Sequence, residues 1–222
     1  MRKIARLTVI TLLLALLVSA SAFAQTIDVY SIMPESFAVP FFEAFTAETG
    51  IKINFVRHSA GEVLVRLIAE KNNPRVSMVF GGPADTFAAA IHEDVLEPYA
   101  PVGVEAIPEL YRDSNNYFTG IALNPIVFLT NKDFLEENNM EAPSSWYDLL
   151  DPAYANGLQM ADARTSGTGF NRIASIIMAL GDEDVAFDYM AKMHENVQVY
   201  TKSGGGGTVP VATRQASSGI FF

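Results

Sequence analysis

The residues of this sequence with the clearest chemical potential lie in one short polar turn, residues 165–169, with the sequence Thr-Ser-Gly-Thr-Gly. An apolar stretch that favours a strand precedes this turn, and apolar residues at helical spacing follow it. Ser166 or Thr168 can cap the helix, and the first N–H groups of a helix lack an intrahelical acceptor. The turn therefore combines N–H groups, hydroxyls and a positive dipole end, which favour an anion or a carbonyl oxygen. The same residues also suit an ordinary strand-to-helix turn.

Four further turns share this composition, at residues 31–35, 59–61, 81–83 and 203–207. Each is predicted to follow a strand and to precede a helix. Such turns gather at the carboxyl edge of a parallel sheet, where ligands bind, so we expect this edge to form a binding site. The candidate ligand-binding residues are Ser31, Ser59, Gly61, Gly81, Gly82, Asn124, Ser166, Gly167, Thr168, Ser203 and Gly204.

The elements that would position these turns alternate between strand and helix in the first half of the chain. Strands are predicted at residues 26–30, 51–55 and 76–80, the last of them buried. The alternation favours a parallel sheet covered by helices. In the first helix Pro40 is expected to cause a kink or a second start. The residues of that helix predicted to face the core are Phe37, Phe41 and Phe45.

The second half is predicted to add strands at residues 117–123, 126–130, 158–160 and 197–200, with a weak helix at 208–218 and a strand that begins at 219. Between the first two strands, Asn124-Pro125 is either a crossing between lobes or a plain turn. In the helix after residue 169, the predicted inward residues are Phe170, Ile173, Ala174, Ile177 and Met178. The helix before residue 197 is predicted to place Phe187, Met190, Ala191 and His194 on one side.

The first 24 residues have the pattern of an export signal. Three basic residues precede an apolar run, and Ala22-Phe23-Ala24 is a small-x-small cleavage site, so cleavage is expected near Ala24. A retained anchor is the alternative. Cleavage removes three basic residues and no acidic one, which leaves 12 basic and 25 acidic residues and a net charge of −13. Such a chain repels nucleic acid at long range, and we expect no nucleic-acid partner.

The sequence offers little that would support catalysis. It contains no cysteine, and no pair of its three histidines has zinc-ligand spacing. The alternative of a secreted α/β hydrolase would require a Gly-x-Ser-x-Gly motif, which the sequence does not contain. Arg172 stands where a dinucleotide fingerprint would need its third glycine. We expect no catalytic residue, no metal ligand and no cofactor.

Several short segments resemble a known family and keep its order. The most telling are residues 27–31, 45–53, 79–85, 145–152 and 165–170. Over nearly the whole mature chain, they are similar to the periplasmic solute-binding proteins of ABC importers. The branch includes ferric-iron-binding, thiamine-binding, phosphonate-binding and sugar-phosphate-binding members.

The resemblance implies an α/β, two-lobed fold of the type 2 periplasmic-binding class, with a helix-covered mixed sheet in each lobe. We expect the lobes at residues 25–120 and 121–222 to close on a ligand by hinge motion. The implied location is the periplasm and the implied partner is an ABC permease in the inner membrane. Because family members continue with a return strand and terminal helices, the second lobe is expected to be incomplete. A non-functional fragment is a further alternative.

The resemblance leaves two classes of ligand open. Ferric-binding members commonly supply a histidine after the first strand and a carboxylate after the third. Residues 32–34 and 81–83 occupy these places here and contain neither group. The family's paired tyrosines would fall beyond Phe222. The turns therefore favour a phosphorylated or carboxylated metabolite, and ferric iron held through a bound anion stays open.

Overall fold

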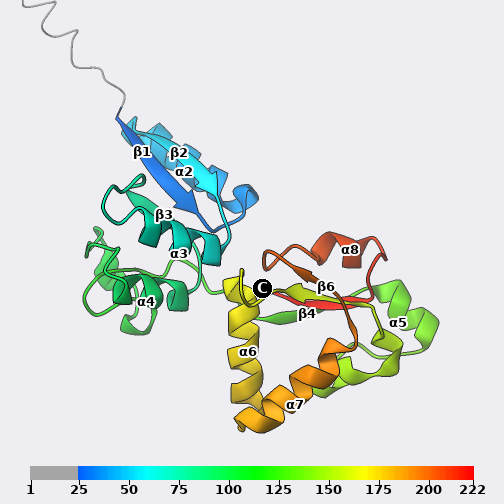
Figure 1. The fold of residues 1–222 in the computed structure, drawn as a ribbon. Helices are drawn as coiled ribbons and strands as arrows, with labels where there is room; N and C mark the ends of the chain where they lie inside the picture. The colour runs from blue at the N-terminus through cyan, green and yellow to red at the C-terminus, as the bar shows by residue number, and fades with distance from the viewer. Residues whose placement is uncertain (1–24) are drawn as a thin grey trace, which may run out of the picture.

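The computed structural model describes residues 25–222, which form two α/β lobes with one sheet each (Figure 1). The predicted export segment lies outside the described residues. The strands are β1 (Thr26–Ser31), β2 (Lys52–Arg57), β3 (Met78–Phe80), β4 (Val127–Thr130), β5 (Leu158–Ala161), β6 (Val197–Thr201) and β7 (Ser218–Phe221). The α-helices are α2 (Glu35–Thr49), α3 (Ala60–Ala69), α4 (Ala84–His92), α5 (Lys132–Asn138), α6 (Gly167–Leu180), α7 (Glu183–His194) and α8 (Thr208–Ala212). The 3-10 helices are η1 (Val104–Ala106), η2 (Glu109–Tyr111), η3 (Trp146–Leu150) and η4 (Pro152–Tyr154).

The first lobe is built on a three-stranded sheet with the order β2-β1-β3. Both pairings are parallel, with Thr26 beside Lys52 and Val29 beside Met78. The helices α2 and α3 connect these strands, because parallel neighbours need a crossover. The predicted alternation of strand and helix is therefore confirmed, although a mixed sheet was expected in this lobe as well.

The second lobe has a mixed sheet with the order β4-β7-β5-β6. The last strand, β7, runs antiparallel to β4 and parallel to β5. All four of its residues are buried, so the end of the chain forms an inner strand of this sheet. The largest core cluster of the described residues lies here and includes Leu149, Tyr154, Leu158, Met160, Ile176, Tyr189, Met193 and Ile220.

The predicted core stripe of α2 is wrong. Phe37 and Phe41 are 61% and 59% exposed, and the buried residues of the helix are Ala38 and Phe42. The ring of Phe42 lies 4.9 Å from that of Phe80, measured between centroids. The helix continues through Pro40 without a second start. Because α2 carries apolar residues on more than one face, spacing alone does not fix which face is buried.

The inward faces of α6 and α7 agree with the predicted ones only in part, since Ile177 and Met190 pack against the core cluster of the second lobe. In α6 Phe170 and Met178 are exposed, whereas Arg172 and Ile176 are buried together with two glycines. In α7 Phe187 is half exposed. The buried residues of α7 are Ala186, Tyr189 and Met193. Helix α6 packs against β5 and α7, and small residues let its first turn approach the sheet closely.

Three local predictions need correction. Residues 117–123 form no strand, and an isolated bridge between Arg112 and Thr119 joins them to the residues that follow η2. Strand β3 is not buried, since Met78 is 41% exposed. Helix α8 ends at Ala212, well before residue 218. Across residues 25–222 no helix is both long and apolar enough to cross a bilayer.

Candidate functional site

The first turn of α6 presents donor groups that lack acceptors. Ser166 is its N-cap residue, yet the side chain of Ser166 makes no capping hydrogen bond. Among the described residues, the backbone N–H groups of Gly167, Thr168 and Gly169 donate to no acceptor. The first turn of a long helix carries a partial positive charge. The predicted donor turn is therefore present with its N–H groups free.

The hydroxyl groups of the same turn are also available. Ser166 is only 6% exposed, and its hydroxyl has no hydrogen-bond partner in the described part of the chain. The hydroxyl oxygen itself is accessible, because the buried unpaired side-chain atoms of the described residues are Tyr154 Oη and Arg172 Nε. A ligand oxygen bound at this turn would supply the missing partner.

Turns of the first lobe lie directly against this donor turn. The N–H of Gly61 donates to the carbonyl oxygen of Thr165 over 3.2 Å. Gly167 lies so close to the first lobe that a Cβ atom there would come within 2.3 Å of Pro83 Cγ. Farther along the helices, Asn171 Nδ2 donates to Asp85 Oδ1 over 3.3 Å. Three of the predicted turns thus meet at the junction between the lobes.

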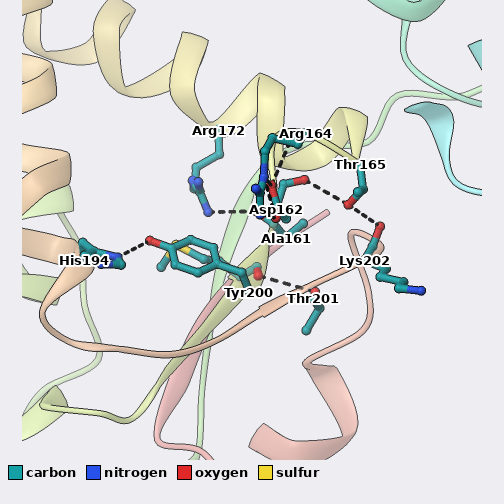
Figure 2. Close-up of polar contacts among 10 residues, drawn as sticks. Ala161, Asp162, Arg164, Thr165, Arg172, His194, Tyr200, Thr201 and Lys202 are labelled. Atoms are coloured by element: carbon teal, nitrogen blue, oxygen red, sulfur yellow. Dashed lines mark hydrogen bonds and ion pairs between the residues drawn. The ribbon is translucent and has the colours of Figure 1, made fainter. Parts of the chain in front are cut away.

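The turn at residues 203–207 joins the same junction from within the second lobe. Thr165 Oγ1 donates to the carbonyl oxygen of Lys202 over 3.2 Å (Figure 2). Gly204 lies against Thr168, and a Cβ atom at Gly204 would come within 2.1 Å of Thr168 Oγ1. Only a residue without a side chain leaves that hydroxyl its space.

The turn after β1 is connected to its neighbours through the backbone. The N–H of His58 donates to the carbonyl oxygen of Ser31, and the N–H of Ile32 donates to Phe80 O, both over 2.9 Å. Gly81 and Gly82 pack against Met33 and Ile32. These contacts hold the three turns of the first lobe at one edge of its sheet.

Several predicted site residues have polar groups that are already engaged. The hydroxyl of Ser31 donates to Met33 O over 3.0 Å, and that of Ser59 donates to Glu62 Oε2 over 2.9 Å. Asn124 is exposed in the segment before β4, and its side chain makes no hydrogen bond within residues 25–222. The structure therefore brings the α6 turn together with Gly61, Pro83 and Gly204, and no hydrogen bond joins Asn124 to them.

The charged groups of the junction are largely paired. The guanidinium of Arg164 donates to Asp162 and, with the N–H of Arg164, lowers the pKa of Asp162 to about 2 (Figure 2). Hydrogen bonds from the N–H and hydroxyl of Ser59 lower the pKa of Glu62. Burial lowers the pKa of His58, which favours its neutral form. Because these charged groups are already engaged, the partial positive charge at the start of α6 remains available to a ligand.

Arg172 is a residue of the junction that the sequence did not predict, since there it stands out only as a departure from a nucleotide-binding motif. Arg172 is 6% exposed and donates from Nη1 to Ala161 O over 3.2 Å (Figure 2). Its spacing from Gly169 and Ile176, three and four residues away, is the signal that would have placed it on the buried face.

Metal ligands are not concentrated in this part of the molecule. The described residues contain no group of three or more His, Asp or Glu side chains that could hold a metal ion. The groups that do converge are N–H and hydroxyl donors. Their chemistry suits oxygen atoms that carry negative charge.

The fold and this junction define a class: two α/β lobes whose polar strand-to-helix turns face each other. Residues 76–209 match the family model described as bacterial extracellular solute-binding protein. A relative from Haemophilus influenzae, described as an uncharacterized protein, is 32% identical over 97% of this chain. The chain belongs to the bacterial extracellular solute-binding protein family.

Other relatives carry more specific names. A Salmonella typhi protein named putative 2-aminoethylphosphonate-binding periplasmic protein is 32% identical over 70% of this chain and 43% of its own length. The structure of the periplasmic binding protein AfuA from Actinobacillus pleuropneumoniae, with fructose-6-phosphate bound, has a TM-score of 0.84 and 28% identity. The fold is that of a type 2 periplasmic binding protein, as predicted.

The chain spans only part of the length of these proteins. It covers 64% of the Haemophilus influenzae relative. It also covers 63% of the AfuA chain, while that match includes 89% of the residues of this chain.

Proposed function

We propose that this protein is the periplasmic binding component of an ABC importer and that it captures a small solute bearing an oxyanion. The uncapped first turn of α6 carries the proposal, because its three free N–H groups and the hydroxyl of Ser166 lack acceptors among the described residues. A phosphate, phosphonate or carboxylate oxygen is the acceptor that such a turn favours. The protein acts by binding and release, without catalysis.

The comparisons support this class of ligand. The named Salmonella typhi relative is called phosphonate-binding, and the AfuA structure holds fructose-6-phosphate. Several relatives are called periplasmic, which supports export through residues 1–24 and docking to a permease. We also propose the lobe boundary near residue 120, so that the segment before β4 serves as the hinge.

Ferric iron is a second candidate, favoured by a Serratia marcescens relative that is 26% identical and named Fe(3+)-binding periplasmic protein. A cation needs acceptor atoms, and the α6 turn offers donors. Iron would therefore bind here together with an anion that occupies the turn.

Isothermal titration calorimetry tests the proposal with fructose 6-phosphate, 2-aminoethylphosphonate, ferric citrate and neutral fructose. We expect binding of at least one anionic compound and none of fructose. Ser166→Ala removes the unpaired hydroxyl and is expected to weaken the binding about tenfold. Thr213→Ala is a control at the C-terminal end of α8, where the hydroxyl donates to Val209 O, and it is expected to leave binding unchanged. Binding of fructose alone, or hydrolysis of the phosphate ester, would contradict the proposal.

A further inference from the structure

A positive charge is buried directly behind the proposed site. The guanidinium of Arg172 makes one hydrogen bond, from Nη1 to Ala161 O, and its Nε atom is buried without a partner in the described residues. No carboxylate of residues 25–222 forms an ion pair with it within 4.0 Å. Arg172 is thus an almost completely buried arginine that lacks an ionic partner.

Such an arrangement is costly. Removing an ion from water costs several kcal/mol unless an opposite charge or hydrogen bonds compensate. Burial accordingly lowers the pKa of Arg172, although arginine stays protonated at neutral pH. The ring of Tyr200 gives partial compensation, with its centroid 6.0 Å from Arg172 Cζ.

The buried guanidinium lies close to the free donors of α6. Figure 2 shows Arg172 extending from α6 toward Ala161 and Asp162 at the end of β5. The carbonyl oxygen of Ala161, which accepts from Arg172, also lies beneath Gly169, since a Cβ atom at Gly169 would come within 2.7 Å of it. The carbonyl group of Ala161 therefore lies between the guanidinium of Arg172 and the first turn of α6.

The other charges of this turn cancel. Asp162 and Arg164 form an ion pair, so they contribute no net charge. Lys202 lies on the neighbouring turn, and its charge adds to the hydrogen bonds from Ser59 that lower the pKa of Glu62 of the first lobe. Arg172 is attracted to Asp162 without forming an ion pair with it, and it adds a buried positive charge behind the turn, in a chain whose net charge is −10.

We propose that Arg172 determines the charge of the ligand: its buried guanidinium makes the α6 turn prefer oxyanions with two negative charges to those with one. This inference rests on the proposed function and deepens it. Arg172 acts through the electric field, which is weakly screened in a buried site. A phosphate monoester or phosphonate is then preferred to a sulfate ester or a carboxylate.

The test compares fructose 6-phosphate with fructose 6-sulfate at pH 7.5, where the phosphate ester is mostly a dianion and the sulfate ester is a monoanion. Calorimetry on the wild-type protein is expected to give a Kd for the phosphate ester about tenfold lower than that for the sulfate ester. In Arg172→Met the Kd values for the two esters are expected to become equal. Arg75→Met removes an exposed arginine of the first lobe and is the matched control, for which the ratio is expected to stay.

The outcomes separate the two proposals. If the wild-type protein binds neither ester nor any other oxyanion, the proposed function fails. If it binds both esters equally, or if Arg172→Met weakens both by the same factor, the function stands and the inference about Arg172 is wrong. Equal affinities of the wild-type protein for the two esters refute the inference even if Arg172→Met does not fold. As a second measurement, the affinity for the phosphate ester alone is expected to rise between pH 5 and pH 7.5.

Discussion

At the scale of single residues, the junction depends on positions where no side chain is tolerated. Gly167 touches Pro83 of the first lobe, and Gly204 touches Thr168 within the second. Both glycines were predicted as candidate ligand-binding residues. The structure gives a second reason for glycine at these two positions. The backbone at Gly167 lies against the ring of Pro83, and the backbone at Gly204 lies against the hydroxyl of Thr168.

Gly167→Ala is expected to weaken ligand binding at least tenfold with a smaller effect on stability, because the new methyl group would meet the rigid ring of Pro83 and hold the lobes apart. Calorimetry with fructose 6-phosphate and thermal unfolding measure the two effects. Gly205→Ala is the control, because a Cβ atom at Gly205 meets nothing within 4 Å. Equal affinities for Gly167→Ala and the wild type would contradict the contact.

The pair Asp162–Arg164 predicts a dependence of stability on pH. Arg164 lowers the pKa of Asp162 to about 2 in the folded protein, against about 3.9 in an unfolded chain. The stabilisation is therefore present above pH 4 and is lost as the pH falls toward 2. Urea unfolding measures the free energy of unfolding at pH 7 and at pH 3. This free energy is expected to fall less between the two pH values in Arg164→Met than in the wild type. An unchanged difference would mean that the pair does not set this pKa.

At the scale of elements, the helix ends follow the sequence closely. Gly181 ends α6 in the left-handed conformation, and Asp182 begins α7 by accepting a hydrogen bond from the N–H of Val185 over 3.0 Å. The capping-box residues Ser145 and Asp148 likewise begin η3. Each of these features joins residues that are close together in the chain, so that capping and turn chemistry determine it without tertiary packing.

Asp182→Ala is expected to lower the free energy of unfolding by about 1 kcal/mol, because one N–H group at the start of α7 loses its acceptor. Chemical denaturation measures the change. Asp188→Ala, at an exposed position in the middle of the same helix, is expected to be neutral or slightly stabilising, since alanine favours helix. A loss of similar size in both variants would refute the capping role.

At the scale of the whole molecule, two lobes meet through few polar contacts. The hydrogen bond from Asn171 to Asp85 joins α6 of the second lobe to α4 of the first. Burial raises the pKa of Asp85, in keeping with its place at the junction. The proposed hinge motion requires such a contact to be weak, because closure has to be reversible.

Asn171→Ala is expected to shift the equilibrium toward separated lobes by several-fold, the factor that corresponds to one net hydrogen bond of about 1 kcal/mol. The sequence contains no cysteine, so cysteines introduced at the exposed positions Val65 and Met178 provide unique sites for two spin labels. Distance measurements are expected to show a larger population of long distances in the variant. Identical distributions would show that this bond does not hold the lobes together.

The sequence by itself determined the order of strands and helices in the first half of the chain and the five strand-to-helix turns, because spacing and turn chemistry act between near neighbours in the chain. It also predicted the two-lobed class, through the resemblance of ordered segments. It did not determine which face of α2, α6 or α7 is buried, because each has apolar residues on more than one side.

The tertiary structure decided what depends on distant partners. The stretch after residue 218 becomes an inner strand because β4 and β5 flank it on both sides. Arg172 becomes a buried charge because α6 packs on the end of β5. The turns of two lobes become one junction because α6 of the second lobe meets Gly61 and Pro83 of the first. Each of these contacts joins residues far apart in the chain, and local propensity carries no information about them.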